Sequence, residues 1–264
     1  MATRMMGVAV VSALMILPVQ ARAETQLPFL IGEKLTYRLE WSWIPVGLTV
    51  ITTSRTKDEN RDLIRILLRT ETNDFMDRLH NVEDTVESLV DPQTLLPVRV
   101  TERVHEPGRS VEEVTEFDRA GNQAHWKSLT TGETKDYAID ANTRDLVSLI
   151  YFLRAREITP GQRESFDVAA YYSVQRFEVE ALKNEKLDLP AYGEVSSLVL
   201  RPTTTSAQLF SRKLPEQVWV STDPRRLLLR IDARVAIGSV RVVLNRVEGP
   251  GNDFWVQPAA ETKP

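Results

Sequence analysis

The sequence predicts a mainly β protein: one large antiparallel sheet, strongly curved or partly closed like a half-barrel, with a single helix packed on its concave face. Short segments that alternate apolar and polar residues follow one another along the chain, separated by turns rich in Gly, Pro, Asp and Asn. One segment near the middle has the spacing of an amphipathic helix instead. Because a sheet of about ten strands curls, we expect this helix to fill its hollow.

The first predicted strand, residues 35–43, alternates without interruption. Its period of two places Tyr37, Trp41 and Trp43 on one face. Pro45 and Gly47 then bend the chain into a second strand at residues 48–53. The same alternation predicts the remaining strands at residues 63–72, 82–90, 96–106, 111–117, 123–129, 164–168, 175–182, 195–201, 217–221, 227–235 and 237–247. A tight hairpin at residues 236–238 joins the last two.

Residues 143–156 predict the helix. The polar run 142–145 is typical of an N-cap, and Leu146, Leu149 and Leu153 recur at helical spacing. A wide apolar stripe of this kind must be buried, and a sheet is the only partner that the sequence offers.

The first 23 residues predict a cleaved secretory signal peptide. Arg4 precedes an apolar run at residues 5–17, and Ala21-Arg22-Ala23 places small residues at the cleavage site. The apolar run is shorter than the ~20 residues that span a bilayer. We expect Sec-type export, cleavage after Ala23 and a periplasmic protein. The mature chain predicts one β-rich domain at residues 24–250 and a tail at residues 251–264.

The composition excludes several classes of partner and chemistry. The chain has 33 basic and 37 acidic side chains and no block of basic residues, which argues against a nucleic-acid partner. It has no cysteine, so disulfides, thiol catalysis and lipid attachment through cysteine are excluded. The mature sequence contains no apolar run long enough for a transmembrane helix.

Six fragments, in this order, resemble an uncharacterised exported bacterial family, domain of unknown function 3108. They are Gly32–Tyr37, Pro45–Gly47, Asp91–Pro97, Asp145–Arg154, Val218–Arg226 and Ile237–Val240. One departure is Leu227-Leu228, where the family pattern has a proline after the arginine pair. The resemblance implies an extracytoplasmic, mostly antiparallel β fold, similar to the open half-barrels of lipoprotein carriers. It implies no activity.

The sequence offers no catalytic or metal constellation. His80, His105 and His125 lack the spacing of metal ligands, so we expect no metal and no cofactor. Ser148 lies on the predicted helix rather than in a nucleophile elbow. Seven glutamates fall where alternation predicts a solvated face and cross-strand pairs with Arg38, Arg99 and Arg103: Glu40, Glu83, Glu87, Glu102, Glu112, Glu113 and Glu116.

The segment Asp223-Pro224-Arg225-Arg226 predicts a turn with solvated arginines at its corner. The alternative is a polar anchor in which Asp223, Arg225 and Arg226 grip a carboxylate or phosphate.

Aromatic side chains are the remaining candidates for ligand binding. Tyr37, Trp41 and Trp43 share the first strand, and Tyr151 and Phe152 lie on the helix. They line either an apolar groove between helix and sheet or, as we favour, a filled core.

The leading hypothesis is therefore a non-catalytic periplasmic protein that binds or chaperones a lipid or other amphipathic component of the cell envelope. A second is a module that binds another envelope protein through a sheet edge. A third is a glycan hydrolase that uses paired strand carboxylates.

Overall fold

The computed structural model describes residues 27, 29–204, 215–235 and 238–257. The predicted signal peptide, residues 236–237 of the last hairpin and residues 258–264 of the tail lie outside this part of the chain. The described residues form one antiparallel sheet of fourteen strands and two helices.

The strands run in chain order through both halves of the sequence. The first half contains β1 (Lys34–Trp41), β2 (Ile44–Asp58), β3 (Arg61–Thr72), β4 (Glu83–Val90), β5 (Pro97–Glu106), β6 (Arg109–Asp118), β7 (Gln123–Ser128) and β8 (Thr134–Ala138). The second half contains β9 (Arg163–Ala170), β10 (Ser173–Leu189), β11 (Gly193–Thr204), β12 (Pro215–Ser221), β13 (Leu228–Arg234) and β14 (Ser239–Glu248).

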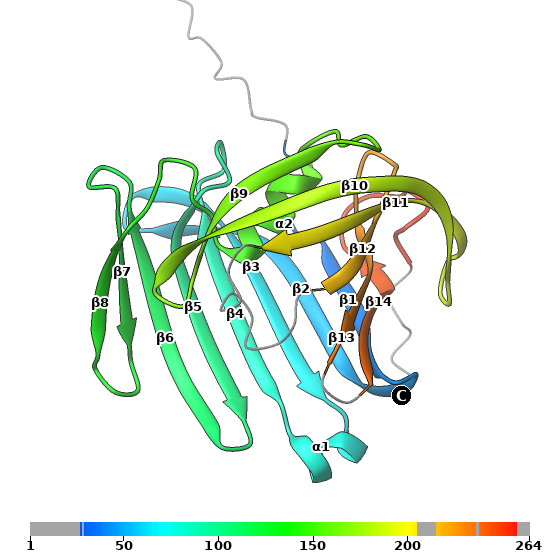
Figure 1. Ribbon diagram of the computed structural model, residues 1–264, viewed down its shortest axis with the longest axis horizontal. Helices are drawn as coiled ribbons and strands as arrows, with labels where there is room; N and C mark the ends of the chain where they lie inside the picture. The colour runs from blue at the N-terminus through cyan, green and yellow to red at the C-terminus, as the bar shows by residue number, and fades with distance from the viewer. Residues whose placement is uncertain (1–26, 28, 205–214, 236–237, 258–264) are drawn as a thin grey trace, which may run out of the picture.

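The sheet is a partly open barrel (Figure 1). Apart from β8 and β9, strands that are neighbours in the chain pair with one another, and β1 also pairs with β14, so that the first and last strands lie side by side. The two ends of the sheet are β8 and β9, which are consecutive in the chain but not hydrogen-bonded to one another. The large curved antiparallel sheet is therefore the architecture that alternation predicts.

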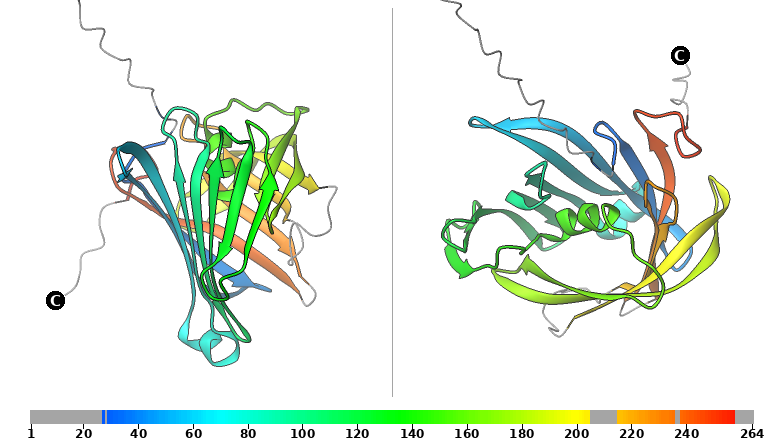
Figure 2. Two further views of the ribbon diagram at one scale, coloured as in Figure 1. Left: turned by 90° about the vertical axis from the view of Figure 1, so that its left-hand side faces the viewer. Right: turned by 90° about the horizontal axis from the view of Figure 1, so that it is seen from above.

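Helix α2 (Leu146–Arg154) occupies the connection between β8 and β9. Asp145 caps it: its carboxylate accepts hydrogen bonds from the backbone N–H groups of Val147 and Ser148, and the Ser148 hydroxyl accepts one from the Asp145 N–H. Seen from above, α2 lies within the curve of the strands (Figure 2). Val147, Leu149 and Tyr151 are buried against the sheet, as an apolar stripe at helical spacing requires.

The expectation of a single helix is wrong, because a second one follows β3. Helix α1 (Asp74–His80) is capped by Asn73 and has no buried residue; Phe75 and Leu79 are exposed. A helix of seven residues with no buried stripe leaves little periodic signal. It extends beyond the sheet at one end of the barrel (Figure 1). Among the described residues, no helix is long and apolar enough to span a membrane.

The structure differs from the sequence expectations at three further places. The first strand ends at Trp41, and Trp43 lies in the tight turn to β2 with a φ of 76°. Gly47 lies within β2 rather than at a bend, where a Cβ atom would meet the backbone oxygen of Glu71 at 2.2 Å. The chain stays ordered past residue 250: Trp255, in the predicted tail, is buried in the main core.

Candidate functional site

Two cavities lie on either side of α2, and Ile150 borders both. One, of about 220 Å³, lies between α2, the loop after it and strands β11–β13; we call it the arginine cavity. The other, of about 290 Å³, lies between the N-terminal end of α2, strands β3–β8 and the β9–β10 turn; we call it the carboxylate cavity. The helix thus divides the hollow of the sheet into two chambers.

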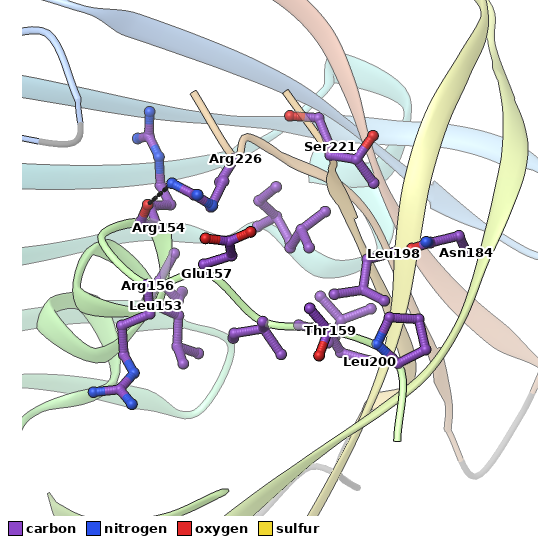
Figure 3. A pocket seen from close by; sticks show the side chains of 17 residues that line it. Leu153, Arg154, Arg156, Glu157, Thr159, Asn184, Leu198, Leu200, Ser221 and Arg226 are labelled. Atoms are coloured by element: carbon purple, nitrogen blue, oxygen red, sulfur yellow. Dashed lines mark hydrogen bonds between the residues drawn. The ribbon is translucent and has the colours of Figure 1, made fainter. Parts of the chain in front are cut away.

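The arginine cavity has apolar walls and a polar rim. Leu153 comes from α2, and Leu198 and Leu200 come from β11 on the facing side (Figure 3). Val218, Val220 and Leu228 complete the wall. These residues face inward because alternate residues of a strand share a face. An apolar chamber of this kind suits a hydrocarbon group.

Arginine dominates the rim of this cavity. Arg154, Arg156 and Arg226 line it with a single carboxylate, Glu157. Arg226 lies beside Glu157 in Figure 3, and its Nη1 donates to the backbone oxygen of Arg154 at 3.5 Å. Arg154 is paired with Glu33, and Arg156 is paired with Glu164 at 2.9 Å. Arg226 is therefore the rim guanidinium that can bind an anionic group at the mouth.

The carboxylate cavity has aromatic walls and an acidic floor. Phe117, Trp126, Tyr137, Tyr171 and Tyr172 line it. Its charged groups are Glu102, Glu113, Asp145 and Arg109. Three carboxylates and one guanidinium therefore line this cavity.

Glu102 and Glu113 are directly opposite one another on β5 and β6 and face into this cavity. Both line a cavity, although Glu102 is exposed to water and Glu113 is half-buried. Glu112 points to the other face and pairs with Arg103 at 2.6 Å. Burial, together with the charge of Glu113, raises the pKa of Glu102 from 4.5 to about 7. The Glu102 residue is nevertheless exposed to water at the opening of the cavity.

The end of the β9–β10 hairpin covers the seam beside this cavity. Tyr171 and Tyr172 form its turn with φ values of 50° and 58°, a conformation that usually favours Asn or Gly. The Tyr172 ring lies 4.1 Å from that of Trp126 on β7, centroid to centroid. Side-chain contacts thus connect the two ends of the sheet where no ladder of hydrogen bonds does.

A buried ion network holds the other end of α2. Glu33 is fully buried, and its two carboxylate oxygens accept hydrogen bonds from Nη1 and Nη2 of Arg154. Nη2 of Arg225 lies 3.2 Å from Oε2 of the same carboxylate. The Tyr151 hydroxyl donates to Glu33 at 3.2 Å, and Arg225 also pairs with Asp253 at 3.2 Å. Burial acts to lower the pKa of Arg154, but the Glu33 carboxylate outweighs it and raises that pKa. The network joins four segments distant in the sequence.

The Asp223–Arg226 segment is a turn, as predicted, but its arginines are not both solvated. The Asp223 carboxylate accepts from the backbone N–H of Arg225 at 2.9 Å. The side chain of Arg225 turns inward to Glu33 and is buried, while Arg226 lines the arginine cavity. Asp223 borders neither of the two cavities beside α2. The sequence alone does not show that Arg225 donates a hydrogen bond to Glu33, a carboxylate 192 positions earlier in the chain.

The five aromatic candidates do not form one surface. Tyr37 and Tyr151 are buried in the main core. Phe152 is half-buried, with the Arg144 guanidinium 3.7 Å from its ring centroid. Trp41 is half-buried at the end of β1, and Trp43 is 74% exposed beneath the Arg241 guanidinium. None of the five borders either cavity beside α2.

The polar residues considered for chemistry lie apart. His80 ends α1, His105 lies on β5 and His125, on β7, is hydrogen-bonded to Asp136 at 2.8 Å. In the described part of the chain, no three His, Asp or Glu side chains gather as they would around a metal ion. Ser148 is fully buried in the helix cap.

Residues 36–245 match the family described as "Protein of unknown function (DUF3108)". The chain belongs to this family. The membership that the six fragments predict is thereby confirmed. No curated protein matches the chain.

Solved structures show a similar fold. A beta-barrel-like protein of the DUF1849 domain of unknown function, from Brucella abortus, matches with a TM-score of 0.53 at 10% identity, covering 84% of this chain and 99% of that one. A protein with a YmcC-like fold from Bacteroides fragilis matches with a TM-score of 0.34 at 8% identity, covering 84% and 98%. At these identities the first likeness supports the barrel-like fold alone.

Proposed function

We propose that this member of the DUF3108 family is an exported, non-catalytic protein that binds an amphipathic component of the cell envelope in the arginine cavity. The ligand has an apolar chain and an anionic head. The observation that carries the proposal is an apolar chamber beside α2 with the Arg226 guanidinium at its mouth. Apolar surface supplies affinity, and a few polar groups at the mouth fix orientation.

The apolar walls support an alkyl chain as the buried part of the ligand. Leu198 and Leu200 are each only 4% exposed and lie on a strand held on both sides in the sheet. Leu153 faces them from a helix fixed by its cap and its C-terminal ion network. Burial of each methylene contributes about 0.8 kcal/mol, so affinity should rise about fourfold for each added CH₂ until the chamber is filled.

The rim supports an anionic head. Arg226 lies at the mouth, and Glu157 is the only acidic side chain among the described residues that line this cavity, whereas Arg156 is paired with Glu164 at 2.9 Å. Guanidinium groups bind carboxylates and phosphates through paired hydrogen bonds. The candidate polar anchor is thus Arg226, with Arg225 held in the buried network instead.

Titration with decanoate tests this directly. We expect saturable binding, tighter than that of octanoate, and weaker binding of decyltrimethylammonium, which has a cationic head. Arg226→Gln should weaken decanoate binding at least about fivefold, while Arg69→Gln, an exposed arginine on β3, should leave it unchanged. Equal binding of both head groups, or no binding of decanoate, would refute the proposal.

Native mass spectrometry of the protein purified from its own envelope gives the second test. The protein should begin at Glu24 and carry a discrete added mass that extracts into organic solvent. A chain that still begins at Met1 would contradict export, and an apo mass would count against a resident cargo.

The sheet edge supports a second candidate, an interaction module. β8 ends the sheet, and most of its five residues are exposed. An extended partner could add a strand there. Crosslinking in the envelope should then place a stoichiometric partner on residues 134–138, and its absence would remove this candidate.

A further inference from the structure

We propose that the carboxylate cavity is a second binding site, independent of the arginine cavity, and that its ligand is an organic cation with an ammonium group and an apolar body. The site is built from the opposed Glu102 and Glu113 side chains and from the aromatic rings around them.

The first step is the placement of the two carboxylates. They occupy directly opposite positions on β5 and β6, and both face the cavity. Like charges opposite one another weaken a sheet. Within the described part of the chain, neither carboxylate forms an ion pair, although outward-facing neighbours such as Glu112 do. A ligand cation would supply the missing charge.

The second step is the fixed orientation of Glu113. The indole Nε1 of Trp126 donates to its Oε2 at 3.2 Å. This contact leaves the other oxygen of the carboxylate for a ligand, and it places an aromatic ring beside the negative charge. Aromatic faces next to carboxylates are the arrangement that attracts ammonium groups, because ring quadrupole and charge act in the same direction.

The third step is the aromatic enclosure. Tyr172, at the end of the β9–β10 hairpin, packs on Trp126, and Phe117 and Tyr137 line the cavity. The strained turn at Tyr171 and Tyr172 holds two aromatic side chains at this opening. An apolar body can therefore be covered while its ammonium group lies between the glutamates.

The charged and titratable groups around Glu102 agree with a cationic ligand. Those that act on it are Glu113 on β6, Asp145 at the start of α2, Asp84 on β4 and the cation Arg109. A second cation, Lys135 on β8, is the register partner of Trp126 and lies 5.3 Å from the Tyr172 ring centroid. Tyr137, whose pKa burial raises to about 12, and Tyr172 stay neutral at physiological pH. Because Glu102 has a pKa of about 7 without ligand, it takes up or releases its proton near neutral pH. A cation should bind best when that proton has left.

Benzyltrimethylammonium is the probe, because its charge does not change with pH and its phenyl ring suits the aromatic walls. We expect calorimetric titration to show binding about five- to tenfold tighter near pH 8 than near pH 6, following the ionisation of Glu102. Benzyl alcohol and benzoate should bind far more weakly. Glu102→Gln and Glu113→Gln should each weaken binding at least about tenfold near pH 8, and Glu102→Gln should also remove the pH dependence.

Glu112→Gln is the matched control, because it changes the neighbouring outward-facing glutamate on the same strand. It should bind the probe as the wild type does. Both cavity variants replace a repelled carboxylate by a neutral amide, so they should fold, as a thermal melt will show. Absence of probe binding at about 10 mM, or equal binding by wild type and both cavity variants, would overturn the proposal. Cleavage of cell-wall glycan by the wild type but not by Glu102→Gln would also overturn it, in favour of hydrolysis.

Discussion

The two sides of α2 face the same curved sheet but are lined by different charged groups, guanidiniums on one side and mostly carboxylates on the other. Toward β11–β13 the helix borders an apolar chamber with arginines at its rim. Toward β5 and β6 it borders aromatic rings and unpaired carboxylates. One helix inside one sheet therefore borders two chemically distinct chambers, for which we propose ligands of opposite charge.

The two ends of α2 are also held differently. At the C-terminal end, buried charges are matched by opposite charges: Glu33 meets Arg154 and Arg225. At the N-terminal end, the Asp145 carboxylate accepts hydrogen bonds from neutral donors, including the Ser88 hydroxyl at 2.9 Å. The buried ion pairs of Glu33 hold the helix in place, whereas Glu102 and Glu113 in the carboxylate cavity form no ion pair among the described residues and are available for a ligand.

The largest effect should follow from Glu33→Gln. It leaves Arg154 buried without its carboxylate, which should lower the free energy of unfolding by about 3–5 kcal/mol. Chemical denaturation measures this. The double variant Glu33→Gln/Arg154→Met should lose less than the sum of the single variants, because it removes the orphaned charge. Additive losses would show that the two groups do not act as a pair.

Asp145→Ala should have a smaller effect at the other end of the helix. It removes an N-cap and the Ser88 hydrogen bond, with an expected loss of about 2 kcal/mol in unfolding free energy. Ser88→Ala, which keeps the cap, should lose about 1 kcal/mol. A loss from Asp145→Ala as large as that from Glu33→Gln would contradict the distinction between the two ends.

Glu102→Gln should stabilise the protein at neutral and alkaline pH but not at about pH 4. The folded state holds the Glu102 proton up to a pKa of about 7, whereas an unperturbed glutamate loses it near 4.5. The folded state thus loses stability through this group as pH rises from about 4.5 to about 7. Near pH 8 the variant should gain about 1 kcal/mol, a modest figure because the carboxylate is open to water.

The control for this pH effect is the outward-facing pair of Glu112 and Arg103. Glu112→Gln should change the unfolding free energy by less than about 0.5 kcal/mol at any pH. A gain from Glu102→Gln that is equal at about pH 4 and pH 8 would show that the carboxylate is not protonated near neutrality.

The smallest expected effect is a difference in the free energy of unfolding between the Tyr37→Phe and Tyr151→Phe variants of the core. The Tyr37 hydroxyl is buried and has no hydrogen-bond partner among the described residues, so Tyr37→Phe should be neutral or stabilising by up to about 1 kcal/mol. The Tyr151 hydroxyl donates to Glu33, so Tyr151→Phe should lose about 1 kcal/mol. Melting temperatures that fall equally in both variants would contradict this difference.

The sequence predicts the sheet well because alternation is a local property. Most strands and α2 lie where period-two and helical spacing place them, and the Asp145 cap is visible in the sequence. β8 is short, polar and exposed, so it gives no alternating signal.

The site could be predicted only in part, since it depends on contacts between distant segments. Period two places the consecutive Glu112 and Glu113 on opposite faces of β6. Only the strand register places Glu102 opposite Glu113, and only the contact of Tyr172 with Trp126 closes the seam beside them. The same holds for Arg225, whose partner Glu33 belongs to the start of the chain. Alternation assigns a residue to a face but does not show which face is concave.

One calorimetric experiment tests the two-chamber account most directly. Decanoate and benzyltrimethylammonium are titrated into the wild type, Arg226→Gln and Glu113→Gln. The account predicts that Arg226→Gln weakens decanoate alone and that Glu113→Gln weakens benzyltrimethylammonium alone. The account of two separate chambers would be contradicted if either variant lost binding of both ligands. It would also be contradicted if both variants bound both ligands as the wild type does.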